Sequence, residues 1–455
     1  MMTKTEQLAK FVAQTKFEDL PENVVQTAKM TILDTLGCML GTVVADPEKA
    51  RVAFEIVKAF GEGDEACVVS TNLKAKAPIA AFANALLGHG IDFDDTHKEA
   101  LTHTSAPVVP AALASAERAK KGGKDFILSF VLGFEVAVRV GMVVMPSHYK
   151  FWHSTATNCT FGAAAAAAKN YGLSEEQIIN ALGLCGTQVA GLLTYLEFGD
   201  HSKSINPGKT AFNGLFSALA AEIGATAPPT MLEHTRGYSY AYCFEEPKLD
   251  NLVRRLGTDW EVVLQNSLKP YPSLAASHSP MDCIIRMVKE HNIKPSDIKK
   301  VTNRTYNTVA SHFSNYDPQT VMAARLSVPY CCAVTAATGA GGMEQFTEET
   351  IFDSTVREVL AKVEIIADPE LNKLYPEKFP AVVTIDLNDG RSFTEKQYYP
   401  TGDPNNPIPP EGLKDKFRGL AKGAIDDDKI EKVIALMDRL EEVEDISDLV
   451  SLLTK

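Results

Sequence analysis

The chain has 455 residues, a formal net charge of −13 at pH 7, 45% hydrophobic residues and 23% charged residues. These proportions are typical of a globular protein that buries a large core. The acidic balance argues against binding to nucleic acid or to an anionic membrane, since both need a basic surface. It leaves room for a small anionic substrate in a pocket that is locally positive.

Residues 1–265 have the pattern of an all-helical domain. The stretch "PENVVQTAKMTILDTLGCMLG" begins with proline, a residue common at helix N-termini, and repeats apolar residues every three or four positions. Further on, "TFGAAAAAAKNYGLSEEQIINALGLCG" predicts two helices that meet at Gly172, with Ser174 as N-cap of the second. Because Ala and Gly are so frequent here, we expect the helices to pack closely.

The most apolar long segment, residues 125–146, carries Asp125, Glu135 and Arg139. These charges indicate a core helix and not a membrane span. The N-terminal stretch lacks the apolar centre of a signal peptide. None of the eight cysteines forms a CxxC or zinc spacing, and most stand in apolar segments. We therefore expect buried, reduced thiols and a cytoplasmic location.

The sequence pattern changes from helical to mixed at about residue 266, and residues 266–404 have the pattern of an α+β domain. The stretch "AVVTIDLNDGRSFTEKQYY" predicts two strands around a turn at Asp389 and Gly390. Single strands are predicted in "IKKVTNRTYNTVA" and "AKVEIIADPEL".

Helices return in residues 405–455, where Ile430, Val433 and Ile434 fall on one helix face with Met437 and Leu440. We expect these helices to rejoin the first domain. The expected fold is therefore mainly α, with a large all-helical domain and an inserted smaller α+β lid domain.

Three motifs suggest cofactor chemistry, but each lacks a residue that its pattern requires. The "NPGKT" stretch lacks the first glycine of a phosphate-binding loop, and "TGAGGME" lacks the last glycine of a dinucleotide fingerprint. In "DFDDTHK", Lys98 stands where a magnesium–diphosphate site needs a third acid. His97 and His103 with Asp94 could bind a metal, but nothing in the sequence fixes that geometry. We predict no metal and no organic cofactor.

Titratable residues concentrate in "GHGIDFDDTHKEALTHTSAP", residues 88–107, between two alanine-rich predicted helices. Four further polar residues stand out in stretches that hold few other titratable residues: His153, Lys203, Lys269 and His278. A lone histidine or loop lysine is usually structural or solvated. Taken alone, these residues indicate only an acid/base site in a helical enzyme, and a helical scaffold or binding protein remains the alternative.

Six stretches in order give the chain a more specific likeness, and together they resemble the MmgE/PrpD family. This family includes 2-methylcitrate dehydratase, cis-aconitate decarboxylase and iminodisuccinate epimerase. The resemblance implies a large helical domain with a smaller α+β lid, in a homodimer. The stretches are "MTILDTLGCMLG", "HGIDFDDTH…THTSAPVVPAALA", "FWHSTATNCTFGAAAAAAKNYGLS", "YLEFGDHSKSINPGKTAFNG", "LKPYPSLAASHSPMD" and "RLSVPYCCAVTAATG".

The resemblance also implies a set of pocket residues. As catalytic groups it gives His103, Asp92 and His153, and as substrate-binding groups Thr96, Lys203, Lys269 and His278. Many relatives have Lys-Arg followed shortly by His where this chain has "KSIN", so that Ser204 and Asn206 remove potential positive charge. We expect the pocket to lie where helical domain and lid meet, with Lys269 at the hinge.

The resemblance implies a small di- or tricarboxylic acid as substrate. Removing a proton beside a carboxylate leaves a basic carbanion, which cations such as Lys203 stabilise. His103 is the expected acid/base, and Asp92 either orients it or carries a second proton. One such site serves dehydration, decarboxylation or epimerisation. We favour a 2-methylcitrate dehydratase-like hydro-lyase of propionate catabolism, with decarboxylase-like and epimerase-like activities as alternatives.

Overall fold

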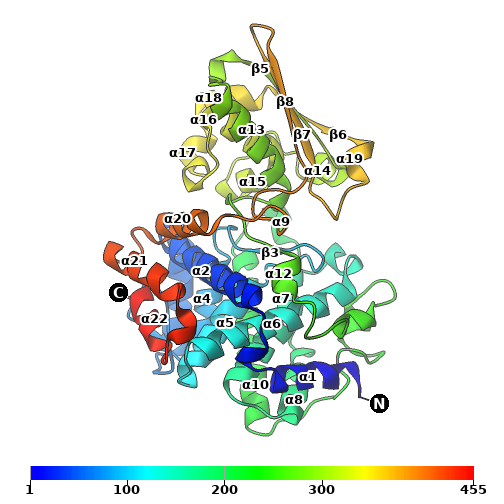
Figure 1. Cartoon of the computed structure of the whole chain (residues 1–455), viewed down its shortest axis with the longest axis vertical. Helices are drawn as coiled ribbons and strands as arrows, with labels where there is room; N and C mark the ends of the chain where they lie inside the picture. Colours follow the sequence, from blue (N-terminus) through cyan, green and yellow to red (C-terminus); the bar gives the residue numbers. More distant parts are fainter. Residues whose placement is uncertain (1, 199) are drawn as a thin grey trace. The chain divides into compact units, whose positions relative to one another are not determined.

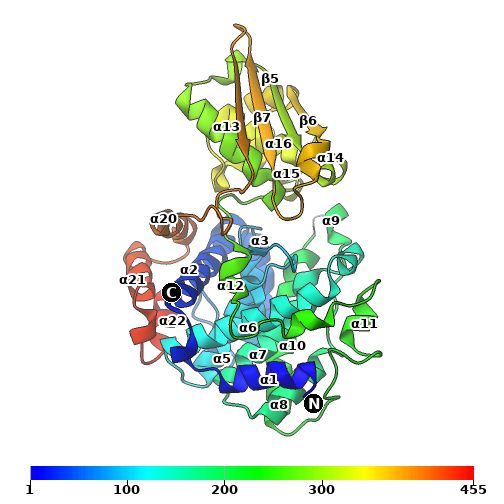
Figure 2. The same ribbon diagram turned by 45° about the vertical axis from the view of Figure 1, so that its right-hand side comes forward.

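The computed structural model describes residues 2–198 and 200–455. It is 58% helical with 9% strand, which confirms the expectation of a mainly α protein with small sheets. The chain divides into two compact units, Met1–Asn266 with Pro409–Lys455 and Ser267–Ile408 (Figures 1 and 2). The role of the second unit as a lid stays a prediction.

Unit 1 is a helical assembly with three short strands of two residues each. Its long helices are α2 (Glu22–Ala45), α6 (Gly123–Val144), α7 (Ser154–Asn170) and α10 (Ser202–Glu222). Its shorter helices are α1 (Lys4–Gln14), α3 (Pro47–Phe60), α4 (Ala77–Gly88), α5 (Ser105–Arg118), α8 (Glu175–Cys185), α9 (Tyr195–Phe198), α11 (Tyr238–Tyr242) and α12 (Glu261–Leu264). The strands are β1 (Ala66–Cys67), β2 (Lys74–Ala75) and β3 (Thr96–His97), while β4 (Asn266–Ser267) spans the boundary between the units.

Small side chains set the spacing of the helices at the centre of unit 1. Helix α7 packs against α5, α6 and α10, and α4 packs against α5 and α10. At the α6–α7 crossing, a Cβ atom added to Gly162 would lie 2.4 Å from the Gly133 carbonyl oxygen. The glycines therefore allow the two backbones to touch, as the Ala- and Gly-rich sequence predicts.

Two helices, α2 and α6, are long and apolar enough to cross a membrane by composition alone. In their most apolar windows, 78% and 100% of the residues are buried inside the protein. This burial agrees with the prediction that residues 125–146 form a core helix.

The helix start predicted at Ser174 is confirmed. The Ser174 hydroxyl accepts a hydrogen bond from the Gln177 backbone N–H at 3.2 Å, and the Gln177 side chain accepts from the Ser174 N–H at 3.0 Å. Gly172 ends the preceding helix with φ of 67°, the left-handed region that favours glycine. Local chemistry thus fixes this helix–helix corner.

The C-terminal helices belong to unit 1. Helices α20 (Pro410–Ala421) and α21 (Asp427–Met437) pack against α2, and α22 (Ser447–Leu453) packs against α21 (Figure 1). The apolar face predicted from Ile430, Val433 and Ile434 is buried. Residues from the end of the chain therefore complete the same core as α2.

Unit 2 combines a four-stranded sheet with helices. The strands β5 (Ile298–Thr305), β6 (Val363–Ala367), β7 (Ala381–Leu387) and β8 (Ser392–Gln397) lie in the order β6-β5-β7-β8. Only the β5–β6 pair is parallel. The main helices are α13 (His278–Glu290), α16 (Val328–Thr338) and α18 (Ser354–Leu360), and the shorter ones are α14 (Asn307–His312), α15 (Val321–Arg325), α17 (Glu348–Ile351) and α19 (Pro369–Asn372).

The sheet of unit 2 has one covered face. Alternate β7 residues from Ala381 to Leu387 are buried, which is the period of two that a half-covered strand requires. Helix α13 packs on β7 and β8 (Figure 2). The hairpin predicted at Asp389 and Gly390 is confirmed, with Gly390 at φ of 91°.

We predict that Gly162→Ala lowers the free energy of unfolding by about 1–3 kcal/mol, because the methyl group forces α6 and α7 apart. The matched control is Gly419→Ala in α20, where no atom lies within 4 Å of the added Cβ. There the change should be neutral or stabilise by about 0.5–1 kcal/mol. Urea denaturation measures both, and equal effects at the two positions would contradict the close-packing argument.

Candidate active site

The charge-rich segment forms a buried turn between the end of α4 at Gly88 and the start of α5 at Ser105. Two non-glycine residues in it, Asp92 and Leu101, have positive φ values of 57° and 49°. Such values are uncommon and persist only where the surroundings hold them. The turn is closed by a backbone hydrogen bond of 2.8 Å from His97 N to Thr102 O.

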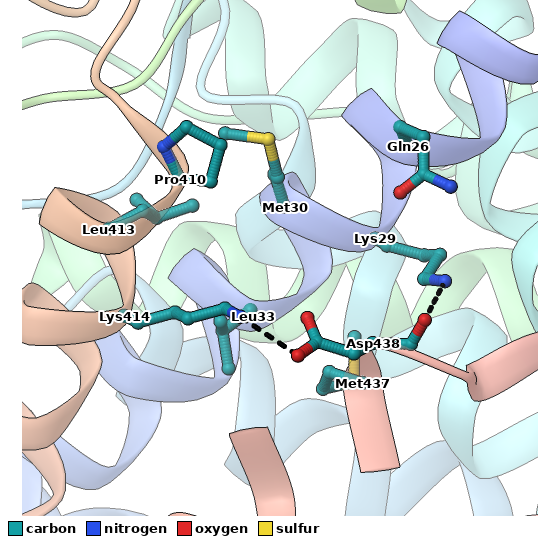
Figure 3. A pocket seen from close by; sticks show the side chains of 9 residues that line it. All are labelled: Gln26, Lys29, Met30, Leu33, Pro410, Leu413, Lys414, Met437 and Asp438. Carbon is teal, nitrogen blue, oxygen red and sulfur yellow. Dashed lines mark hydrogen bonds and ion pairs between the residues drawn. The ribbon is translucent and has the colours of Figure 1, made fainter. Parts of the chain in front are cut away.

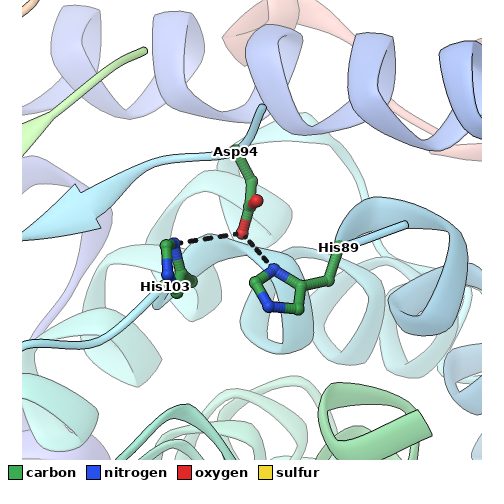
Figure 4. Close-up of side chains that lie close together, drawn as sticks. All are labelled: His89, Asp94 and His103. Carbon is green, nitrogen blue, oxygen red and sulfur yellow. Dashed lines mark hydrogen bonds and ion pairs between the residues drawn. The ribbon is translucent and has the colours of Figure 1, made fainter. Parts of the chain in front are cut away.

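Two histidines flank one buried carboxylate in this turn (Figure 4). Asp94 Oδ2 lies 2.8 Å from His89 Nδ1 and 3.6 Å from His103 Nδ1. The two rings are 4.8 Å apart between centroids. The side chains of His89 and Asp94 are fully buried, whereas that of His103 is 20% exposed. His103 is therefore the member of the group that a substrate can reach.

The surroundings of His103 select its tautomer. Its Nδ1 lies 2.8 Å from the Asp95 carbonyl oxygen, which only accepts hydrogen bonds, so Nδ1 carries the proton. The Thr96 hydroxyl lies 3.4 Å from the same nitrogen, and Thr155 Oγ1 accepts from the His103 N–H at 2.9 Å. The lone pair of the neutral ring then lies on Nε2. The ring is oriented to exchange a proton through that atom.

Lys203 comes to this turn from helix α10. Its Nζ lies 2.7 Å from Asp92 Oδ1, and both side chains are largely buried. The lysine provides a cation beside the turn, and a substrate carboxylate would join or displace this pair. The sequence predicted Lys203 and Asp92 as pocket residues, and the structure brings the two together.

His153 stands at the N-cap of α7, also within ring contact of this group. Its ring centroid is 5.8 Å from that of His89 and 5.0 Å from that of Tyr195. Burial holds the pKa of His153 well below its ordinary value, and the neighbouring His89, His103 and Lys203 lower the pKa further. The ring is therefore neutral at pH 7, and Asn206 Nδ2 lies 3.1 Å from its Nδ1.

Several buried polar atoms in and beside this group have no hydrogen-bond partner among the described residues, including His89 Nε2, His153 Nε2 and Ser204 Oγ. Leaving a buried polar atom unpaired costs about 1–3 kcal/mol. Such costs are tolerated where a ligand supplies the missing partner. The cluster is thus suited to a substrate with several oxygen atoms.

Lys269 and His278 lie in the second unit. His278 begins α13, its Nε2 is 3.1 Å from the Ser273 carbonyl oxygen, and Tyr271 contacts its ring edge-on. The expected pocket where the two domains meet, with Lys269 at the hinge, stays a prediction. The residues brought together in unit 1 are Asp92, Thr96, His103, His153 and Lys203.

Sequence reasoning gave no role in proton transfer to His89, Asp94 or Asn206. His89 and Asp94 lie in the predicted motif, but the spacing of three aspartates does not say which one faces a histidine. Asn206 stands where the family resemblance leads us to expect a histidine, and its amide contacts His153. The departure from the family pattern at this position was the only sign in the sequence that Asn206 belongs to the site.

His89, Asp94 and His103 also offer ligand atoms within 4.8 Å of one another, a spacing that a divalent cation could use. This group contains His89 where the sequence suggested His97. The Nε2 atom of His97 lies instead 3.6 Å from Glu261 Oε2, and its Nδ1 accepts from the Ala100 N–H.

Comparison with known proteins gives matches along the whole chain. The MmgE/PrpD N-terminal domain matches residues 6–250 and the MmgE/PrpD C-terminal domain matches residues 271–442. The cis-aconitate decarboxylase of Homo sapiens is 30% identical, over 100% of this chain and 95% of its own length. The enzyme of that name from Aspergillus terreus is 28% identical, over 99% of this chain and 95% of its own length.

We predict a pH-dependent effect of Asp95→Asn on stability. Burial, and then the charge of Asp94, raise the pKa of Asp95 to about 8. An unfolded aspartate titrates near pH 3.9, so between about pH 4 and pH 8 only the folded state holds this proton. Stability therefore falls as pH rises through this window, by up to about 1.4 kcal/mol per pH unit.

Asp95→Asn removes that slope, so the gain in urea midpoint of the variant over the wild type should grow from pH 5 to pH 8. Asp125→Asn, at an exposed position in the first turn of α6, serves as control and should give a profile parallel to that of the wild type. A constant difference for Asp95→Asn across this range would show that Asp95 is already ionised.

We also predict that activity persists in EDTA and does not rise with added Mg²⁺, Mn²⁺ or Zn²⁺, because the proton transfer derived above uses side chains alone. Activity is measured after dialysis against EDTA and after each metal is added back. Loss of turnover in EDTA that a divalent cation restores would refute the expectation and make the His89–Asp94–His103 group the first metal site to test.

Proposed function

The chain belongs to the MmgE/PrpD family, and from this premise we propose that it is a carboxy-lyase acting on an unsaturated tricarboxylic acid of the cis-aconitate type. A lyase role is supported at the family level, because relatives that match its full length include cis-aconitate decarboxylases. The observation that carries the proposal is His103, part-exposed and oriented by Asp94 and the Asp95 carbonyl.

The chemistry needs one proton donor and one stabilised carbanion. When a carboxylate on the methylene carbon leaves as CO₂, the electron pair of the broken bond spreads over the adjacent double bond. Protonation at the far end of this allylic system then completes the reaction. The electron pair is stabilised while it lasts by nearby cations, and Lys203 is the cation beside the turn.

His103 fits the role of the donor in its charged form. The Asp94 carboxylate, 3.6 Å from Nδ1, stabilises positive charge on the ring. Nε2 then delivers the proton to carbon, and the neutral ring recovers a proton from water. Such general acid catalysis contributes about 10²–10⁴-fold.

Lys203, with Lys269 and His278 as further predicted contacts, would bind the remaining carboxylates. Binding a carboxylate before and during the reaction affects both substrate affinity and turnover. Thr96, 3.4 Å from His103 Nδ1, is placed to orient either the ring or the substrate.

The second candidate is the hydro-lyase favoured by the sequence, with a substrate such as 2-methylcitrate. Dehydration needs one group to accept the proton removed from carbon and a second group to protonate the departing hydroxyl group. The neutral ring of His153, 5.8 Å from that of His89, supports this alternative because it would accept the proton while His103 serves as the acid. Epimerisation would need the same two groups. Assembly as a homodimer, a cytoplasmic location and a part in propionate catabolism stay predictions.

A single assay in D₂O separates these reactions. With cis-aconitate, decarboxylation releases CO₂ and leaves one deuteron in the product, seen by NMR and mass spectrometry. With 2-methylcitrate, dehydration produces a double-bond absorbance without CO₂. Exchange of a C–H proton without net conversion indicates an epimerase. Absence of all three with every di- and tricarboxylate tried would favour the scaffold or binding protein.

We predict that His103→Ala lowers kcat by at least about 10²-fold, with little change in melting temperature because the side chain is part-exposed. Saturating substrate should not restore turnover. Full rescue at high substrate would instead make His103 a binding residue and move the proton transfer to another group, such as His153 or Asp92.

Lys203→Ala should raise KM and lower kcat together, with partial rescue at high substrate. The matched control is Lys209→Ala on the same helix, which removes the same charge from a side chain that donates to the Ala190 carbonyl oxygen at 2.9 Å. Equal losses in both variants would point to a general effect of charge on α10.

A further inference from the structure

A lysine from the C-terminal part of the chain reaches the backbone of the catalytic turn. Lys416, on α20, donates from Nζ to the Phe93 carbonyl oxygen at 2.7 Å. The same Nζ lies 2.6 Å from Asp34 Oδ1 on α2 and 3.8 Å from the centroid of the Phe93 ring. Only 8% of the lysine side chain is exposed, and that of Asp34 is fully buried.

Phe93 stands between the two carboxylates that contact the candidate catalytic groups. Asp92 before it pairs with Lys203, and Asp94 after it lies between His89 and His103. A shift of the Phe93 peptide therefore moves both carboxylates at once. Positioning errors of about 1 Å at such groups cost up to about 10²-fold in rate.

Side chains from other helices hold the backbone at this point. Asp92 has φ of 57°, a left-handed conformation that aspartate adopts more readily than most residues but that is still uncommon. A second lysine, Lys49 on α3, donates to the Gly90 carbonyl oxygen at 2.8 Å and so holds the start of the same turn. The Lys416 contact holds its middle.

We propose that Lys416 is a positioning residue of the active site, which fixes the Phe93 carbonyl so that Asp92 and Asp94 stay beside Lys203 and His103. Asp34 balances the charge of the lysine. This inference rests on the proposed function for its kinetic consequence, but its structural consequence at the His103 ring is measurable without any substrate.

A purely structural role is the competing explanation, because the Asp34–Lys416 pair also joins α2 to α20. Removing Lys416 alone leaves a buried, uncompensated carboxylate, which destabilises proteins strongly. Lys416→Met alone therefore does not distinguish the two roles. The double variant Asp34→Asn/Lys416→Met removes both charges with little change in volume.

The melting temperature of the double variant should lie closer to that of the wild type than the melting temperature of Lys416→Met does. Its kcat should nevertheless stay at least about 10-fold below the wild-type kcat. Asp34→Asn alone keeps the Lys416–Phe93 contact, so it should lose stability but retain kcat within about 3-fold. Circular dichroism at low temperature verifies that Asp34→Asn and the double variant are folded before kcat is measured. If neither Lys416→Met nor the double variant folds, the test is Asp34→Asn, in which a large loss of kcat would overturn the proposal.

The second readout is the ¹⁵N spectrum of labelled histidines, with His103 assigned from His103→Ala. In the double variant the ring signals of His103 should move, because Asp94 and the Asp95 carbonyl no longer hold the Nδ1 proton in place. Recovery of both stability and kcat with unchanged His103 signals would show that Lys416 serves the fold alone.

The control is Lys414→Met, two residues earlier on α20. Lys414 pairs with Asp438 at 2.8 Å, at the edge of a cleft of about 260 Å³ between α2, α20 and α21 (Figure 3). It loses the same charge from the same helix without a contact to the turn, so kcat and the His103 signals should stay as in the wild type.

If the wild type converts none of the carboxylic acids tested, the proposed function fails. The histidine spectrum still decides the role of Lys416 in that case, since it requires no turnover. Movement of the His103 signals in the double variant but not in Lys414→Met would then keep the positioning role, and unchanged signals would remove it.

Discussion

Burying a turn that carries three aspartates and three histidines between apolar helices is the constraint on which this site depends. A buried charge without a partner costs several kcal/mol, so each one must find a counter-ion or a hydrogen bond. Asp94 is held by two histidines and Asp92 by Lys203 from α10. Asp95 instead keeps its proton below about pH 8, and its side chain accepts from Ser105 at the start of α5. Lys203 comes from a helix far from the turn in the sequence, so this part of the site forms only when the fold does.

The close helix packing explains how α7 and α10 bring their side chains to the site. Gly133 and Gly162 let α6 and α7 touch, and Gly214 brings α10 against Ala163 of α7. Helix α10 then presents Lys203 to the turn and Asn206 to His153 at the N-terminus of α7. Rigid elements at van der Waals contact hold such groups more accurately than loops do.

The sequence could predict the elements whose causes are local. The Ser174 cap, the Gly172 corner and the Asp389–Gly390 hairpin follow from side-chain and backbone preferences within a few residues. The mainly α fold follows from apolar periodicity over longer windows. Candidate site residues came from the family resemblance, and the structure brings five of them together in unit 1.

Long-range pairs could not be predicted in the same way. Three aspartates in one motif look equivalent in the sequence, and only the folded backbone, with its left-handed turn at Asp92, shows that Asp94 is the one between two histidines. Lys416 lies 323 residues from Phe93, and in the sequence it resembles any lysine on an amphipathic helix. Only the structure shows that its Nζ donates to the Phe93 carbonyl oxygen. Tertiary contacts of this kind depend on the whole fold.

The central claim is that Asp94 acts through His103 as one proton-transfer unit. A double-mutant cycle on kcat with Asp94→Asn and His103→Ala tests it most directly, because groups that act together are not additive. Asp94→Asn should slow the wild type strongly and slow His103→Ala hardly at all. Equal losses in both backgrounds would show that the two residues work independently and that the carboxylate does not serve this histidine.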